Sequence, residues 1–213
     1  MHERPDASLR SRAVSVAPLF PLPGVSLYPG CVMPLHVFEP RYRCMIEDLL
    51  DGPGRLVMGT VLEDHAHEIA GSPPVLDVAG LGEIARHVRR EDGCFDILLV
   101  GMSRVRIREV ASDRPYRRVE TETLEEKPVP RESHDALRDA LHRAILSRCN
   151  ELLNLPAQMP ISNLADLLVQ RIELPQPVVA RLYAELDVEA RARAALSEHA
   201  RRPLPPSASP PSP

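Results

Sequence analysis

Short apolar runs separated by turn residues fill the chain up to about residue 127 and predict β-strands. The continuous run RLVMGTVLE at 55–63 predicts a buried strand, whereas the prolines within SVAPLF and CVMPLHV suit strand ends and sheet edges. Asp92 and Gly93 separate two further strand-like runs and predict a hairpin, because glycine accepts the positive φ of a type I′ turn. Together these runs predict a small antiparallel β-structure, closed or nearly closed.

Strict alternation in SRVRIREV, at 103–110, predicts a strand with Val105 and Ile107 on one face. The other face carries arginines, and further arginines could lie close to it. They are Arg104, Arg106 and Arg108 on the strand, with Arg86, Arg89 and Arg90 before it. A basic face could bind phosphate or an acidic peptide. We favour a solvated face, balanced by the acids of VETETLEE on the next strand through cross-strand pairs.

Beyond a seam at EEKPVPRES, where Pro128 and Pro130 forbid regular pairing, apolar residues recur at helical spacing. Four helices are predicted, within 133–153, 162–174, 175–186 and 187–202. The stripe of the first helix consists of Leu137, Leu141, Ile145, Cys149 and Leu152. Ser162 suits an N-cap and Pro177 a first helical turn, whereas the last helix has a thin stripe made mostly of alanine. Short connections between four helices predict a bundle.

The pattern therefore predicts an α+β protein, in which an antiparallel β-barrel-like domain precedes a four-helix bundle. We place the β-rich domain at 15–126 and the helical bundle at 131–202. The polar N-terminus, 1–14, and the Pro/Ser-rich tail, 203–213, are predicted to be disordered.

Composition narrows the class of protein. Hydrophobic residues make up 44% of the chain but aromatic residues only 3%, so the core must be mainly aliphatic. A net charge of -4 gives no chain-wide reason to bind nucleic acid. The N-terminus lacks the apolar segment of a signal peptide, and no apolar run reaches the ~20 residues that span a membrane. These features predict a soluble cytoplasmic protein without a membrane partner.

Several kinds of catalytic site are disfavoured. The four cysteines, Cys31, Cys44, Cys94 and Cys149, form no C-x-x-C pair and are interpreted as free thiols. DGPGRLVMGT lacks the Lys-Ser/Thr ending of an ATPase P-loop and precedes a strand. A serine–lysine dyad is implausible, because Lys127 lies beside Pro128, where nothing would bury it and lower its pKa.

The stretch PLHVFEPRYRCMIEDLL, at 34–50, gathers groups that could act as base, acid, anion clamp and nucleophile. They are His36, Glu39, Arg41, Tyr42 and Cys44. Spacing favours a structural interpretation: Pro40 begins an amphipathic helix, Glu39 complements its dipole, and Gly52 suits its C-terminal cap. Arg41 or Arg43 can pair with Glu47 or another acid nearby. A Cys/His pair would also need an orienting group and an oxyanion site, which this stretch does not offer.

A second candidate is DHAHE, in which His65 and His67, with Asp64 or Glu68, could bind zinc or nickel. On a strand both imidazoles would point the same way. The following IAGSPP favours a solvated surface loop instead, and no further ligand pair follows at a metal-site spacing.

The segment at 18–50, PLFPLPGVSLYPGCVMPLHVFEPRYRCMIEDLL, closely resembles the start of the Lon protease N-terminal, or substrate-binding, domain. LVMGTVL, VAGLGEIARHVRREDGCFDILLVGMSRVRIREV and PYRRVETETLEE continue the likeness, and LADLLVQRIELPQPVVARLYAELDVEAR resembles the helical subdomain that follows. The resemblance implies a PUA-like pseudo-barrel of the Lon N-terminal type joined to helices. Cys94 stands where the family usually has arginine. The chain ends where the coiled coil, ATPase and serine–lysine protease domains of Lon would begin, so neither activity is implied.

The resemblance implies a non-catalytic module that binds unfolded or exposed apolar polypeptide segments, with the groove between the two domains as the expected site. Such a module could be an adaptor in protein quality control, with an ATP-dependent protease or chaperone as partner. We assign no catalytic, cofactor-binding, metal-binding or substrate-binding residues and expect no cofactor. The alternatives are a small metal- or ligand-dependent enzyme that uses His36, His65, His67 and the cysteines, or an RNA-binding PUA-like protein.

Overall fold

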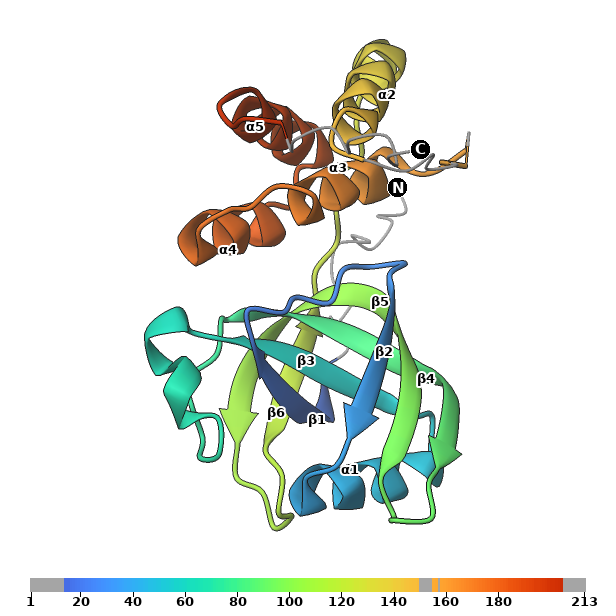
Figure 1. The fold of residues 1–213 in the computed structure, drawn as a ribbon, viewed down its shortest axis with the longest axis vertical. Coiled ribbons are helices and arrows are strands. Elements are labelled where there is room, and N and C mark those ends of the chain that lie inside the picture. The colour runs from blue at the N-terminus through green and yellow to red at the C-terminus, as the bar shows by residue number, and fades with distance from the viewer. Residues whose placement is uncertain (1–13, 150–154, 157, 205–213) are drawn as a thin grey trace, which may run out of the picture.

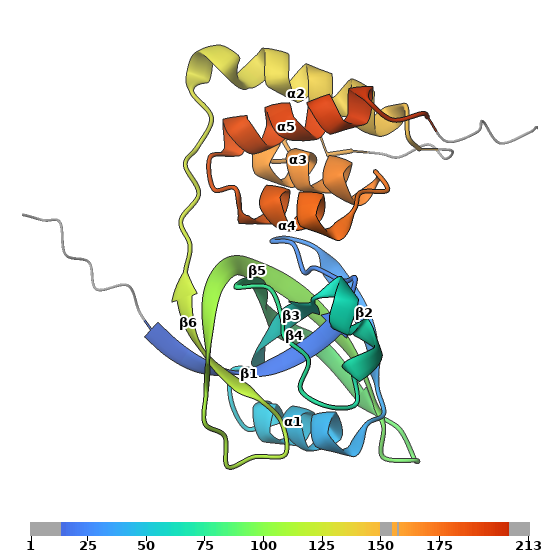
Figure 2. The same ribbon diagram turned by 90° about the vertical axis from the view of Figure 1, so that its left-hand side faces the viewer.

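A computed structural model describes residues 14–149, 155–156 and 158–204, and every structural statement below concerns these residues. The predicted disordered ends fall almost wholly outside them, as does Leu152 of the predicted helical stripe. The described chain forms a β-barrel with one helix closing its lower end and four helices stacked above its upper end (Figures 1 and 2).

The barrel is built from six strands. They are β1 (Val14–Pro23), β2 (Val32–Val37), β3 (Arg55–Val61), β4 (Val78–Arg89), β5 (Phe95–Val110) and β6 (Arg118–Thr123). The sheet order is β2-β5-β4-β3-β1-β6, and an additional pairing of β5 with β6 closes the ring. The long strand β5 therefore pairs with β6 through its second half and with β2 through its first half. The predicted fold class is confirmed, although β1 and β3 pair in parallel rather than antiparallel.

Helix α1 (Pro40–Leu50) begins at the predicted proline and closes the barrel from below (Figure 1). Its buried side chains are Tyr42, Met45 and Ile46, and the edge of Tyr42 meets Phe20 with ring centroids 4.6 Å apart. The predicted glycine cap is wrong, because Asp51 ends the helix and Gly52 does not adopt a positive φ.

The β4–β5 hairpin is present, but its turn differs from the predicted type I′. The N–H of Gly93 donates to the carbonyl of Arg90 at 3.0 Å, and Gly93 has a φ of 79° while Asp92 keeps a negative φ. A turn of this form, closed by a left-handed glycine, is a three-residue hairpin loop with a glycine bulge. Glycine is thus required at one position of the turn, where type I′ would need positive φ at two.

The helical part consists of α2 (Arg131–Leu146), α3 (Ile161–Gln170), α4 (Gln176–Ala184) and α5 (Val188–Ala200). The bundle is confirmed, and Pro177 lies in the first turn of α4 as predicted. Ser162 is not an N-cap, because α3 begins directly after Pro160 and the Ser162 hydroxyl bonds to Asn163. Helix α5 is deeply packed against α2 and α3 despite its thin stripe, since Ala192 and Ala195 let the helices approach closely.

Bundle and barrel meet along the segment that joins β1 to β2. Leu27 and Tyr28 in this segment lie against Gly80 of β4 and Gly101 of β5, where a Cβ on either glycine would overlap the segment's backbone carbonyls. From above, the buried Tyr183 hydroxyl of α4 donates to the Leu27 carbonyl at 2.5 Å. Because these two strand positions are glycines, the connecting segment can lie directly against the sheet, and Tyr183 of the bundle holds it there by its hydrogen bond.

A buried ionic cluster, formed by Arg104, Glu126, Asp166 and Arg191, completes this contact. Arg104 of β5 donates to Asp166 of α3 and to Glu126 of the linker, both at 2.7 Å. Arg191 of α5 reaches the same two carboxylates, at 3.1 Å and 2.7 Å. The prediction of a solvated arginine face is therefore wrong for Arg104, which is only 1% exposed.

The rest of that face follows the prediction. Arg106 and Arg108 are exposed and pair with Glu122 and Glu120 on β6. Arg104 differs because the bundle lies over the strand at that point, so its charge must be matched by buried acids.

Candidate functional site

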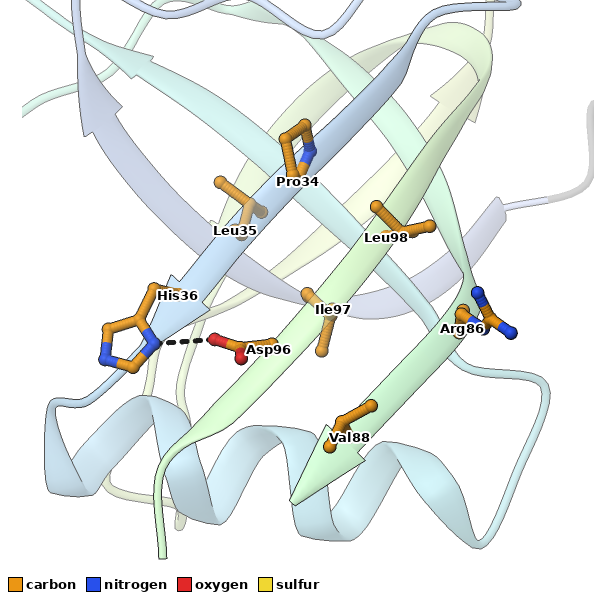
Figure 3. A pocket seen from close by; sticks show the side chains of 8 residues that line it. All are labelled: Pro34, Leu35, His36, Arg86, Val88, Asp96, Ile97 and Leu98. Atoms are coloured by element: carbon orange, nitrogen blue, oxygen red, sulfur yellow. Dashed lines mark hydrogen bonds and ion pairs between the residues drawn. The ribbon is translucent and has the colours of Figure 1, made fainter. Parts of the chain in front are cut away.

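A groove of about 410 Å³ crosses the outer surface of the ribbon formed by β2, β5 and β4 (Figure 3). It is called the outer groove below. Its lining consists of Pro34, Leu35 and His36 of β2, Asp96, Ile97 and Leu98 of β5, and Arg86 and Val88 of β4. Strand register places six of these side chains in two rows across the ribbon, one of Pro34, Leu98 and Arg86, the other of His36, Asp96 and Val88.

The outer groove has an apolar floor and exposed apolar neighbours. Val88 is 57% exposed, and beyond the groove Val32 of β2 and Phe38 after it are 61% and 62% exposed. Phe38 stacks on the His36 ring, with centroids 6.1 Å apart. Large apolar side chains gathered at a concave surface indicate a binding site more strongly than the same side chains scattered singly.

Asp96 and His36 form the polar end of the outer groove. His36 Nδ1 donates to one oxygen of Asp96 at 2.7 Å, and Arg90 Nε donates to the other at 2.6 Å. These bonds, that from Arg90 foremost, hold the pKa of the Asp96 carboxyl below its usual range. The groove therefore keeps a fixed anionic group beside its apolar floor at neutral pH.

The lowered pKa of Asp96 sets the sign of a pH effect on stability. Because the ionised form is favoured in the fold, its contribution is present above the unfolded-state pKa of about 3.9 and is lost as pH falls below that value. We expect Asp96→Asn to lower the melting temperature slightly at pH 7, with the difference shrinking as pH falls below that value and vanishing once Asp96 is protonated in the folded protein. Calorimetry of both proteins across this range measures it, and a pH-independent difference would contradict the assignment.

The cluster predicted at 34–50 is divided between different environments. His36 lies in the outer groove, whereas Arg41 bonds to Glu39 at 3.0 Å and donates to the carbonyls of Ile69 and Gly71. Tyr42 is buried, and Cys44 packs partly buried against the barrel core. Arg41 thus ties the start of α1 to a distant loop.

The predicted pairing of Arg41 with a nearby acid is met by Glu39. Glu47 pairs at 2.9 Å with Arg89 of β4, rather than with Arg41 or Arg43. Arg86 and Arg89 pair with Leu98 and Phe95 of β5, far along that strand from the basic face at 104–108. They do not join that face, and Arg86 instead borders the outer groove (Figure 3).

His65 and His67 lie on a short 3-10 helix, η1 (Glu63–Glu68), not on a loop or strand. His65 bonds to Glu68 at 2.9 Å and His67 is 3.6 Å from the same carboxylate. No group of three potential metal-ligating side chains is found in the part of the chain that the structure describes. His36 is not part of this pair, since it bonds to Asp96 on the barrel ribbon.

The predicted groove between the domains corresponds to a cleft of about 250 Å³. Residues of the barrel, η1 and α4 line it, among them Pro23, Thr60, Ala66, Leu174 and Val179. Gln176 bridges it, donating to the Val61 carbonyl and accepting from the Glu63 N–H, both at 2.7 Å. Much of the remaining contact between barrel and bundle is filled by the ionic cluster and Tyr183, so the cleft is smaller than the outer groove.

Sequence reasoning did not single out Asp96, Asp166 or Arg191. A signal existed for Arg191, which follows the apolar Val188 at helical spacing. Asp166 gave none, because it lies away from the apolar stripe of its helix. For Asp96 there was none, since it alternates normally along its strand.

None of the helices in the described ranges is both long and apolar enough to cross a bilayer.

A family model described as the ATP-dependent protease La (LON) substrate-binding domain matches residues 16–199. Lon protease 2 of Sorangium cellulosum is 28% identical over 198 residues, which cover 84% of this chain and 24% of that protease. Lon protease 2 of Myxococcus xanthus is 24% identical over 197 residues, covering 85% and 23%. The chain thus spans about a quarter of the length of these relatives.

Solved structures show the same fold. The N-terminal domain of a Lon protease from the Mycobacterium avium complex superposes with a TM-score of 0.67 at 19% identity, covering 89% of this chain and 100% of that one. A Lon N-terminal domain protein from Xanthomonas campestris gives 0.64 at 22% identity, covering 86% and 98%.

Proposed function

The chain belongs to the Lon substrate-binding domain family, and we propose from this premise that it is a non-catalytic module that binds unfolded or exposed apolar polypeptide segments. The match of the family model confirms the resemblance to this family that the sequence predicts. The β-rich domain at 15–126 would carry the contact surface and the helical bundle at 131–202 would support it. The module would act in the cytoplasm as an adaptor in protein quality control, passing segments to an ATP-dependent protease or chaperone.

The outer groove is the observation that carries this proposal. It offers apolar side chains for an extended segment to cover, in a concavity of about 410 Å³ open along one side of the barrel. Unfolded chains differ from folded ones in exposing apolar side chains and free backbone groups together. A surface that combines exposed Val88 with polar groups at its end suits such chains better than a small polar ligand.

A titration with labelled unfolded casein tests the proposal. We expect wild-type protein to bind unfolded casein but not a folded protein of similar charge. The double variant Val88→Ser and Leu98→Ser should bind about tenfold or more weakly, because two apolar contacts are lost. Fluorescence anisotropy measures both.

Val16→Ser is the matched control, because Val16 is 47% exposed but lies on β1, outside the outer groove. It should bind casein like the wild type. Absence of casein binding at about 50 μM, a range that detects weak complexes, would refute the proposed function. Weakening by Val179→Ser instead of the groove variant would move the site to the interdomain cleft.

A further inference from the structure

Among the residues that the structure describes, the end of β4 has an edge without a strand neighbour. Strand β3 pairs with β4 only as far as Glu83, and the last bond on that side runs from the Ile84 N–H to the Gly54 carbonyl at 2.9 Å. From Arg86 to Arg89, β5 is the one strand of the described chain that pairs with β4. This edge borders the outer groove, because the side chains of Arg86 and Val88 form its margin (Figure 3).

The hydrogen-bond pattern tells which backbone groups face this edge. The Arg90 N–H donates to the Cys94 carbonyl at 2.8 Å, so Arg90 points its backbone toward β5. In an antiparallel pair the direction alternates with each residue. Arg86 and Val88 therefore also bond toward β5, whereas His87 and Arg89 present their N–H and C=O groups outward.

The other margin of the ribbon is less suited to accept a strand. On this side, the Gly101 N–H donates to the Cys31 carbonyl, so Gly101 faces β2 and, by the same alternation, Leu99 and Ile97 do too. The residues of β2 opposite Leu98 and Asp96 are Pro34 and His36, and their backbone groups therefore point outward. Pro34 has no N–H to offer there, and proline is a usual means of blocking a sheet edge. The β4 edge, in contrast, presents the backbone N–H groups of both His87 and Arg89 outward.

Charge selects the occupant of the β4 edge. Between Ile84 and Arg90 the chain carries three arginines, one histidine and no acid. Arg89 and Arg90 pair with Glu47 and Asp96, whereas Arg86 has no ion pair among the described residues. A second copy of this edge would bring like charges together, which disfavours self-pairing. An acidic side chain placed opposite Arg86 would complete a cross-strand pair instead.

We propose that the polypeptide segment is bound as an added strand along Arg86–Arg89 of β4, and that the preferred segment carries apolar and acidic residues two positions apart, on one face of the strand. The inference rests on the proposed function and specifies its mode. Backbone groups of the segment bond to His87 and Arg89. On the face that lies over the outer groove, an apolar side chain beside Val88 extends the floor, and an acid two positions away faces Arg86. Strand addition of this kind obtains affinity from the backbone and selectivity from alternate side chains.

Two substitutions at one position test the backbone contact. His87→Pro removes an outward N–H without removing a bond to β5, whereas His87→Ala removes the side chain and keeps that N–H. We expect His87→Pro to weaken binding of a twelve-residue peptide that repeats Val-Thr-Glu-Thr, and so carries valine and glutamate in turn on one face, about tenfold. His87→Ala should bind it like the wild type. Equal melting temperatures of the two variants show that the fold is kept, and equal affinities of folded variants would overturn the inference.

The charge preference is tested with a second peptide, in which lysine replaces glutamate. Wild-type protein should prefer the glutamate peptide, and Arg86→Glu should weaken its binding about fivefold while improving binding of the lysine peptide. Casein that binds the wild type and His87→Pro equally would overturn strand addition but leave the proposed function intact. A dimer that His87→Pro dissociates, seen by sedimentation, would show self-pairing and overturn the choice of occupant.

Discussion

Asp166→Ala is expected to lower the free energy of unfolding by about 3–5 kcal/mol, because it leaves buried arginine charges without their partner. Arg104 and Arg191 are 1% and 0% exposed, and both reach the carboxylate of Asp166. Glu126 would remain as the single acid between two guanidinium groups. Urea unfolding followed by circular dichroism measures the loss.

Arg193→Ala provides the matched control for a helix ion pair. Arg193 pairs with Glu189 on the exposed side of α5, with 62% of its side chain in solvent. Pairs of this kind contribute only about 0.3–0.5 kcal/mol. A loss below about 1 kcal/mol for Asp166→Ala would show that the cluster is hydrated in solution and that its charges need no mutual compensation.

Gly101→Ala is expected to cost about 2–3 kcal/mol through overpacking, although it adds only one methyl group. That methyl would overlap the Tyr28 carbonyl oxygen and lie 2.9 Å from its carbon, and backbone cannot swing aside like a flexible side chain. The connecting segment would have to move out of the sheet, and the bond between Tyr183 and Leu27 would lengthen. Chemical denaturation measures the loss of stability.

Gly52→Ala is the control for that change. Gly52 has no positive φ, and a Cβ there would meet nothing closer than the Leu49 carbonyl at 3.8 Å. Its stability should stay within about 0.5 kcal/mol of the wild type. If Gly101→Ala proved equally mild, the segment at 27–31 would be free to shift, and close approach would not explain the glycine.

Local patterns predicted the elements of this fold well. Pro40 begins α1, Pro177 lies in the first turn of α4, and Asp92–Gly93 marks the β4–β5 hairpin, because each depends on neighbouring residues only. The predicted exposure of Arg104 was wrong because it depends on residues distant in the sequence. Alternation along β5 is correct, but solvent on one side of that strand is replaced by α3 and α5, which come from much later in the chain.

The outer groove could not be predicted from one sequence either. Its lining comes from three strands, and the row of Pro34, Leu98 and Arg86 exists only once their register is known. The sequence indicates His36 as a possible base, but its partner Asp96 lies sixty residues away, so the pair cannot be read from local spacing. The resemblance of 18–50 to a known family predicted the fold, because that segment carries the barrel's first strands and α1.

The buried ionic cluster makes the linker a poor place to divide the molecule. Four charged residues from β5, the linker, α3 and α5 form ion pairs with one another across the contact between barrel and bundle. A barrel released at Pro128 would keep Arg104 and Glu126 but lose Asp166 and Arg191. Although the chain has two architectural parts, we expect them to unfold as one cooperative unit, so that amide protons on both sides of the contact exchange through the same global opening.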